Sequence, residues 1–179
     1  MAPQTSTKLT YEDYLLLPDD GRRHEIIDGE HYVSPAPNTR HQRLSKRISR
    51  ALYPFEDAGL GEVFSAPYDV VLSFFDVVQP DVIFVTAARS HIIVEKNVQG
   101  APDLAVEILS PSNRQYDEQV KLKTYERLGV AEYWIVDPDE SSVRIFRRSG
   151  ERFTPADAGD TLTTPLLPGF ALPLRDLFA

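Results

Sequence analysis

Two apolar, strand-like segments of the chain each carry a carboxylate, and a helical segment that follows them carries a lysine. The first segment, Gln79–Val85, contains Asp81; the second, Asp103–Leu109, contains Glu107; and the lysine is Lys121. An acid within an apolar strand is strongly destabilising when it is left unpaired. Acids in two such strands therefore favour a bound cation or a catalytic role at this place.

The periodicity of the segments predicts which way these side chains point. Side chains alternate along a strand, so Glu107 belongs to one face of its strand. A helical wheel of about 100° per residue turns Lys121 inward and Lys123 outward. A buried lysine is uncommon unless it is paired. We expect Lys121 to pair with Glu107, with Asp81 or with the neighbouring Asp117.

Pro80 directly precedes Asp81 in the first segment. Proline cannot donate a hydrogen bond to a sheet, so Pro80 predicts a strand start, an edge or a bulge that re-aims the next side chain. For either acid taken alone, a salt-bridged residue at a strand end is the competing interpretation.

Length and composition predict one domain over residues 1–179. The chain is 42% hydrophobic, contains 14 prolines and 9 glycines, and has no cysteine. The absence of cysteine excludes disulfides and thiolate metal sites and suits a reducing cytosol. Residues 1–8 have no apolar core typical of a signal sequence, and no apolar run approaches the roughly 20 residues that span a bilayer. We expect a soluble, cytoplasmic protein.

The net charge of −8 argues against tight non-specific binding of nucleic acid, because proteins of that class are usually basic. Any such binding must be local or assisted by a metal. Five bases nevertheless fall on one side of the helix predicted after residue 38, and they are either a solvated outer face or a local DNA contact. These bases are Arg40, Arg43, Lys46, Arg47 and Arg50.

The order of the expected strands and helices predicts an α/β (α+β) fold with a mixed central sheet flanked by helices. Helices are expected over residues 9–17, from Asn38 or Thr39 to about Gly59, and from a Ser112/Gln115 capping box to Gly129. Hairpins are expected around Asp28-Gly29 and around residues 138–140. Further strands are expected over residues 63–65, 68–72, 77–85 and 104–109.

Other candidate residues carry weaker signals. His41 lies on the apolar side of its helix, which favours a partly buried structural histidine over a site role. His24, His31 and His91 do not have metal-ligand spacing. Asp69 could point into the same cleft as the acids, but pairing in a hairpin explains it equally well.

In the order of these residues the chain resembles the PD-(D/E)XK nuclease superfamily, which has the restriction-endonuclease fold. More narrowly, it resembles a widespread bacterial family of uncharacterised restriction-endonuclease-like proteins. The segments that carry the resemblance are HEIIDGE at 24–30, SPAPNTRHQ at 34–42, VVQPDVIFV at 77–85, DLAVEILSPSNR at 103–114 and DEQVKLKTYERLGVAEYWIVDP at 117–138. Together they cover most of the chain.

The resemblance implies that Asp81 and Glu107 hold a divalent ion, Mg²⁺ or Mn²⁺, together with the main-chain carbonyl of Ile108. It implies a further catalytic acid at Glu25. The superfamily usually has a lysine two residues after the second acid, where this chain has Leu109. In the narrower family the lysine is displaced to the next helix, which matches Lys121.

Two hypotheses of different class follow. The first is a metal-dependent endonuclease that hydrolyses phosphodiester bonds in DNA. Oxygen ligands suit Mg²⁺ or Mn²⁺, and such an ion activates water and polarises a phosphoryl oxygen. The second is a non-catalytic, homodimeric interaction or scaffold domain on the same fold, which the acidic charge favours.

Overall fold

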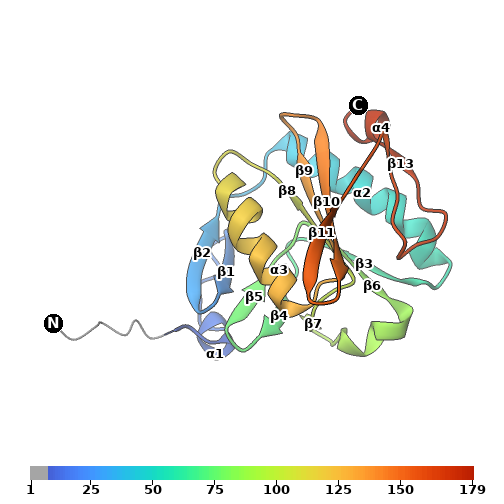
Figure 1. Ribbon diagram of the computed structural model, residues 1–179. Helices are drawn as coiled ribbons and strands as arrows, with labels where there is room; N and C mark the ends of the chain where they lie inside the picture. The colour runs from blue at the N-terminus through green and yellow to red at the C-terminus, as the bar shows by residue number, and fades with distance from the viewer. Residues whose placement is uncertain (1–7) are drawn as a thin grey trace.

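The computed structural model describes residues 8–179 and contains two larger β-sheets and a small two-stranded one (Figure 1). The six-stranded sheet has the strand order β11-β10-β9-β8-β6-β3, and the five-stranded sheet has the order β2-β1-β5-β4-β7. Both sheets are mixed, because β8 and β9 pair in parallel in the first and β4 and β7 do so in the second. The predicted α+β architecture is confirmed, with two sheets at its centre instead of one.

The strands of the six-stranded sheet are β3 (Gly61–Ser65), β6 (Val82–Thr86), β8 (Leu104–Ile108), β9 (Glu132–Asp137), β10 (Ser142–Ser149) and β11 (Arg152–Ala156). Those of the five-stranded sheet are β1 (Arg23–Ile27), β2 (Glu30–Ser34), β4 (Val70–Ser73), β5 (Asp76–Val78) and β7 (Val98–Gln99). The small sheet pairs β12 (Thr161–Leu162) with β13 (Leu172–Pro173). The helices are α1 (Tyr11–Tyr14), α2 (Thr39–Asp57), η1 (Ala87–Ile92), the π-helical η2 (Tyr116–Lys121), α3 (Leu122–Leu128) and α4 (Leu174–Leu177).

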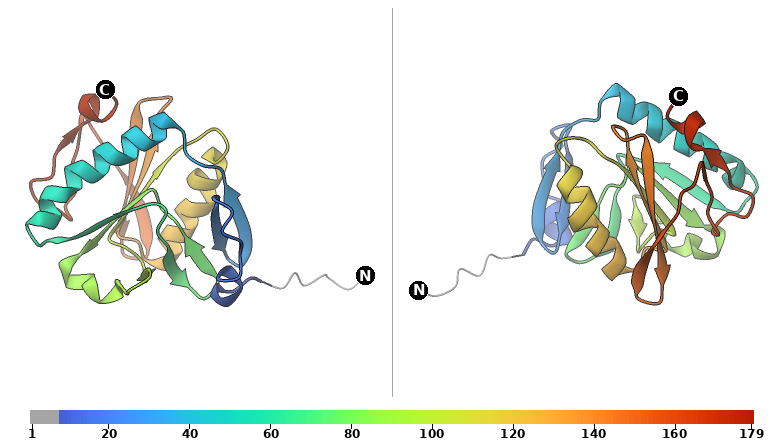
Figure 2. Two further views of the ribbon diagram at one scale, coloured as in Figure 1. Left: turned by 180° about the vertical axis from the view of Figure 1, so that it is seen from behind. Right: turned by 45° about the horizontal axis from the view of Figure 1, so that its top comes forward.

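Helices α2 and α3 cover opposite faces of the six-stranded sheet (Figures 1 and 2). Alternation along β6 and β8 divides their apolar side chains between two cores. One core contains Val82, Phe84, Leu104 and Val106 together with Leu44, Ile48 and Leu52 of α2. The other contains Ile83, Val85, Ala105 and Leu109 together with Tyr125 of α3. Strand β8 is buried along its whole length, as predicted for a central strand.

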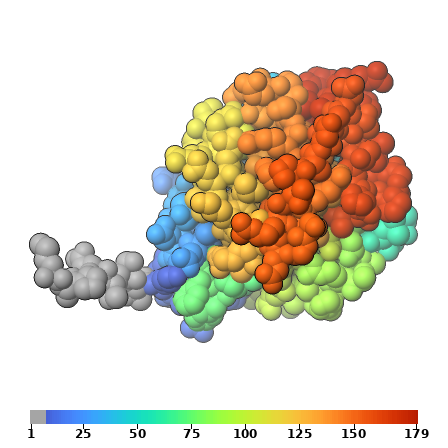
Figure 3. All heavy atoms as spheres, viewed as in Figure 1, coloured from blue at the N-terminus to red at the C-terminus, as the bar shows by residue number. Residues whose placement is uncertain are grey.

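Local signals set several element ends as predicted. The Asn38 side chain accepts a hydrogen bond from the His41 N–H at 2.9 Å and caps α2. The β1–β2 hairpin turns at Asp28 and Gly29, and Gly129 ends α3. Helix α3 packs beside β11, and the two elements lie on the same face of the molecule (Figure 3).

The structure corrects the extent of the strand predicted over residues 77–85. It is two strands, β5 and β6, which lie in different sheets. Asp81 therefore sits directly before β6 and not within a strand. The missing N–H of Pro80 explains the break, since the chain cannot continue one ladder through it. The strand start predicted from Pro80 is confirmed.

Two predicted helices also differ. The first is shortened to α1, because Leu15 and Leu16 are 61% and 83% exposed and bury nothing that would prolong it. The capping box predicted for the later helix does not form: Ser112 bonds Ser110, and Gln115 makes no side-chain cap. Within residues 8–179, every helix is too short or too polar to span a bilayer.

Gly61 is predicted to be irreplaceable at the start of β3. A Cβ atom at this position would lie 2.2 Å from the Val85 carbonyl oxygen and 2.6 Å from the Phe84 ring. Because that carbonyl belongs to the neighbouring strand, it cannot move aside cheaply. We expect Gly61→Ala to lower the free energy of unfolding by more than about 3 kcal/mol in urea titrations. The control Gly59→Ala, at φ +74° with nothing within 4 Å, should cost only about 1–2 kcal/mol. Equal losses would contradict the steric explanation.

Candidate active site

Three buried carboxyl groups from three elements converge on the ammonium group of Lys121. Its Nζ atom lies 2.7 Å from Glu107 Oε1, 2.9 Å from Glu25 Oε1 and 3.7 Å from Asp117 Oδ1. All four residues are no more than 3% exposed. A single lysine therefore balances three acids in the interior, where charges are tolerated only when paired.

The local structure explains why these side chains meet. Glu107 faces the α3 side of β8, and Glu25 comes from the middle of β1 in the other sheet. Asp117 and Lys121 both lie in η2 and point inward from it. A π-helical turn of this kind is rare and occurs frequently at functional sites.

Neutral donors also bond two of the acids. The Tyr125 hydroxyl donates to Glu107 Oε1 at 2.7 Å. The Gln79 N–H donates to Glu25 Oε1 at 2.6 Å. These bonds hold the carboxyl groups in fixed orientations, since each oxygen accepts from more than one direction.

Asp81 belongs to a second, adjoining group. Its Oδ1 accepts from Arg23 Nη1 at 2.5 Å, and its Oδ2 accepts from His41 Nε2 at 2.9 Å and from the Ile108 N–H at 2.8 Å. Burial by itself would raise the pKa of Asp81, but the hydrogen bond from His41 and the charges of His41 and Arg23 outweigh it and hold the pKa below its ordinary value. Asp81 is thus held as a carboxylate.

The acids around Lys121 shift in the opposite direction. Burial raises the pKa of Glu107 well above its ordinary value, although Lys121 opposes this, and the nearby charges of Asp117 and Asp81 add to the rise. Burial likewise raises the pKa of Asp117 to about 7. Lys121 stays protonated, because the charges of Glu107, Glu25 and Asp117 outweigh the effect of burial and raise its pKa. Burial thus opposes ionisation of Glu107 and Asp117 and the neighbouring Lys121 favours it, whereas the partners of Asp81 hold that residue ionised.

Three buried polar atoms around these acids have no hydrogen-bond partner within residues 8–179. They are Nδ1 of His41, Oε1 of Gln79 and the Tyr116 hydroxyl. His41 holds Asp81, Gln79 holds Glu25, and the Tyr116 ring lies 5.2 Å from Lys121 Nζ. A buried polar atom without a partner is costly. The polar shell of the site is therefore incomplete without water or a ligand.

The oxygen-rich donor set suits a hard divalent cation such as Mg²⁺ or Mn²⁺. Glu25, Asp81, Glu107 and Asp117 supply four carboxyl groups against the permanent charges of Lys121 and Arg23, so full ionisation leaves an excess of negative charge. Nevertheless, no group of three or more His, Asp or Glu side chains in residues 8–179 is placed ready to hold a metal ion. Ion binding would have to displace some of the present hydrogen bonds.

The structure brings together four of the predicted site residues, Glu25, Asp81, Glu107 and Lys121, and shows which of them pair. Lys121 is buried and pairs with Glu107 and Asp117, as expected, but not with Asp81; its third partner is Glu25. Lys123 is exposed, as predicted.

Sequence reasoning missed the roles of Arg23, His41 and Tyr116. His41 was expected to be structural, yet its ring holds Asp81. Its helical register with Leu44 already indicated that it faces inward. Arg23 stands two residues before Glu25 in β1, so strand alternation would have placed both on one face. Tyr116 had no comparable signal.

The predicted basic residues of α2 lie outside this buried cluster. Arg40, Arg43, Lys46 and Arg50 are exposed. Arg40 lies 3.7 Å from Asp139, and Arg47 donates to the Leu177 carbonyl at 2.8 Å. Arg47 therefore holds the C-terminal segment, and the exposed Arg43, Lys46 and Arg50 face solvent.

Three other residues considered from the sequence, His24, His31 and Asp69, do not contact Lys121 or its acids directly. His24 Nδ1 lies 2.9 Å from His31 Nε2, although their spacing gave no sign of a pair, and His24 Nε2 lies 2.9 Å from Asp20. Asp69 accepts from the Tyr14 hydroxyl at 2.7 Å and from the Gln79 amide at 2.8 Å.

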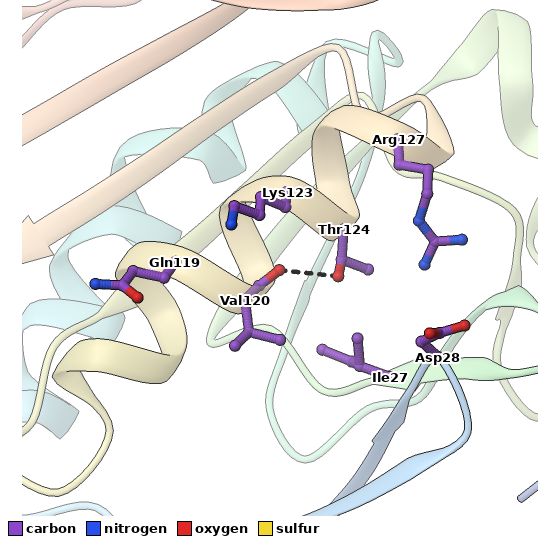
Figure 4. A pocket seen from close by; sticks show the side chains of 7 residues that line it. All are labelled: Ile27, Asp28, Gln119, Val120, Lys123, Thr124 and Arg127. Atoms are coloured by element: carbon purple, nitrogen blue, oxygen red, sulfur yellow. Dashed lines mark hydrogen bonds between the residues drawn. The ribbon is translucent and has the colours of Figure 1, made fainter. Parts of the chain in front are cut away.

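Two surface pockets lie near the site, and they differ in whether they adjoin the buried acids. A pocket of about 470 Å³ lies between the end of β1 and the η2–α3 helix, with Lys123 and Arg127 on its rim (Figure 4). None of the four buried acids lines it. A smaller cleft of about 170 Å³ includes Arg23 and His41 in its lining and therefore adjoins Asp81.

Removal of Lys121 is expected to destabilise the protein strongly. Lys121→Met leaves three buried carboxyl groups without their cation and should lower the free energy of unfolding by about 3–5 kcal/mol at pH 7. Lys123→Met, on the exposed side of the same helix, should change it by less than about 0.5 kcal/mol. Urea unfolding followed by circular dichroism measures both. Similar values for the two variants would show that the buried pairing is wrong.

Asp117 is expected to make stability fall as the pH rises. Its pKa is about 7 in the folded protein against an ordinary 3.8, so between these values the folded state binds a proton that the unfolded chain has released. The free energy of unfolding then decreases with pH over this range. Asp117→Asn should remove that component, whereas Glu95→Gln, at an exposed acid, should not. Parallel pH profiles of wild type and Asp117→Asn would refute the assignment.

Comparisons with known proteins identify the fold and the family. The crystal structure of "a putative nuclease belonging to DUF820" from Anabaena variabilis superposes with a TM-score of 0.79 at 22% identity, covering 95% of this chain and 97% of that one. The uncharacterized protein slr1290 of Synechocystis sp. is 26% identical over 149 residues, which is 80% of this chain and 76% of the relative. The family model Uma2, described as "Putative restriction endonuclease", matches residues 11–175. The chain therefore belongs to the Uma2 family and has its restriction-endonuclease-like fold.

Proposed function

We propose that this protein is a divalent-metal-dependent nuclease that hydrolyses phosphodiester bonds in DNA. The observation that carries the proposal is the convergence of Glu25, Asp81, Glu107 and Asp117 around Lys121 and Arg23, in a shell that still contains unpartnered polar atoms. Buried carboxyl groups whose pKa values are shifted in opposite directions are typical of sites that carry out proton chemistry or bind ions. The description of the family as restriction endonucleases and the description of the structural relative as a nuclease support the same activity.

In this proposal Asp81 and Glu107 hold the ion, and the main-chain carbonyl of Ile108 is a further ligand. A bound Mg²⁺ or Mn²⁺ would supply an activated water and polarise the phosphoryl oxygen. Asp81 is already ionised and needs no proton loss to act as a ligand. Glu107 bonds Lys121 through Oε1, and burial raises its pKa, so an ion at this residue would have to favour the ionised carboxylate.

Lys121 and Glu25 have roles beside the ion. An ammonium group close to the reacting phosphate stabilises negative charge that develops in the transition state. Lys121 is the cation in the cluster that is close to both Glu25 and Glu107. Glu25 orients the ammonium group, and its own position is held by the Gln79 N–H.

One observation favours the alternative of a non-catalytic scaffold domain. The acids are satisfied by protein cations in this structure, and no ready-made ion site is present within residues 8–179. If the ion pairs serve stability alone, divalent ions should leave the folded state unaffected. The metal response below separates the two functions.

Divalent ions are expected to stabilise the folded state through Asp81 and Glu107. A ligand at 100 times its dissociation constant that binds only the native state adds about 2.7 kcal/mol, which should raise Tm by about 5–10 °C for a chain of this length. We expect Mn²⁺ to produce such a rise in wild type and Asp81→Asn to abolish it. Glu95→Gln removes one acid at an exposed position and should retain the rise. An equal response of Asp81→Asn and wild type would disprove the assigned ion site.

Metal-dependent cleavage is expected to require Glu107. Wild type should nick supercoiled and single-stranded DNA in the presence of Mn²⁺ or Mg²⁺. The assay is done at low salt, because binding to DNA weakens as the salt concentration rises. Glu107→Gln, which preserves the shape of the side chain, should lower the rate at least about 100-fold. Glu95→Gln should cleave at the wild-type rate. Wild-type cleavage by Glu107→Gln would remove Glu107 from the mechanism.

A further inference from the structure

The 170 Å³ cleft beside Asp81 is formed by two loops and the start of α2. Its walls are the segments 34–38 and 110–113, and Arg23 and His41 complete its lining. The Asn113 amide donates to the Ser34 hydroxyl at 3.0 Å and ties the two loops to each other. Because Arg23 and His41 also hold Asp81, these two side chains separate the cleft from the acid.

The cleft is free of acids in a strongly acidic protein. None of the described residues that line it is Asp or Glu, although the chain carries a net charge of −8. Arg23 contributes a guanidinium whose Nη1 holds Asp81, and guanidinium groups have five N–H donors in a geometry that matches phosphate. The 19-residue α2 also begins at the cleft without an acid in its first turn, so its positive end is not neutralised there. The cleft is thus suited to an anion.

His41 supplies an independent sign of a ligand. Its ring is buried, with 7% of the residue exposed, and lines the cleft. Asp81 is a carboxylate that can only accept hydrogen bonds, so Nε2 of His41 carries the proton between them. Nδ1 is left buried and without a partner in residues 8–179. A hydroxyl group or water that enters the cleft with an anion would complete it.

The size of the cleft restricts what can enter. About 170 Å³ is roughly the volume of five or six water molecules. That is enough for a phosphate group and part of its sugar, but not for both strands of a duplex. The acids behind it are only 2–3% exposed, so they present no open surface to a phosphate group.

We propose that the cleft binds a backbone phosphate of a single DNA strand, and that the protein acts on unpaired strands in preference to continuous duplex. The proposal rests on the nuclease function above and defines its substrate class. Arg23 binds the phosphate, the α2 N-terminus adds a favourable potential, and the two tied loops exclude the second strand.

The test uses charge substitutions at the rim of the cleft. Ser112 is an exposed cleft residue, and Ser90 is an exposed serine in η1 outside the cleft. Binding of a fluorescent single-stranded oligonucleotide and of the blunt duplex of the same sequence is measured by anisotropy, at low salt and without divalent ions. We expect wild type to bind the single strand at least 10-fold more tightly than the duplex. Ser112→Glu should weaken single-strand binding about 10-fold and Ser112→Lys should strengthen it, while Ser90→Glu and Ser90→Lys change it less than about 2-fold.

The outcomes distinguish this proposal from the nuclease function. Equal or tighter binding of duplex, or equal effects of Ser112→Glu and Ser90→Glu, would overturn the cleft as a strand site. Cleavage of plasmid by wild type that is lost in Glu107→Gln would still support the nuclease function in that case. Conversely, single-strand binding that follows the charge at Ser112, without metal-dependent cleavage, would support the cleft and overturn the nuclease.

Discussion

A lysine ammonium group shared by three buried carboxyl groups is the interaction on which the rest of the site depends. Glu25, Glu107 and Asp117 come from β1, β8 and η2, and each is tolerated in the interior because Lys121 is within reach. The cost of an unpaired buried charge is high. The register of β8 and the turn of η2 are therefore coupled, since a shift of either by one residue would turn an acid away from its cation.

The site has two halves with opposite electrostatics. Around Asp81, Arg23 and His41 favour the ionised carboxylate; around Glu107, burial and neighbouring acids favour the protonated one. Strand β1 joins the halves, because Arg23 and Glu25 alternate onto the same side of the strand. One acid of the site, Asp81, is thus held as a carboxylate, whereas burial opposes ionisation of Glu107. The site therefore differs from an ion site in which every carboxyl group is permanently ionised.

Net charge and local charge point in different directions in this protein. The overall charge of −8 would repel a polyanion, yet the cleft beside Asp81 contains no acid among its described residues. The Arg23 guanidinium serves both sides: it neutralises Asp81 on the inside and presents donors to the cleft. The placement of a few groups thus gives one small part of the surface a different electrostatic character from that of the whole chain.

The sequence by itself determined the directions of the main side chains. Strand alternation turned Glu107 toward α3, helical spacing turned Lys121 inward and Lys123 outward, and Pro80 marked the start of β6. These features follow from short-range geometry, which repeats every two residues in a strand and every 3.6 in a helix.

Only the tertiary structure decided which of these side chains meet. Asp81 contacts His41 and Arg23, 40 and 58 positions away in the chain, and Lys121 contacts Glu25 of the other sheet. Periodicity specifies the face from which a side chain leaves its element, but not the element that faces it. The break at Pro80 sends β5 and β6 into different sheets, and this packing brings Glu25 and Asp81 to the same place. The partners of the acids, and hence their pKa values, depend on that long-range packing.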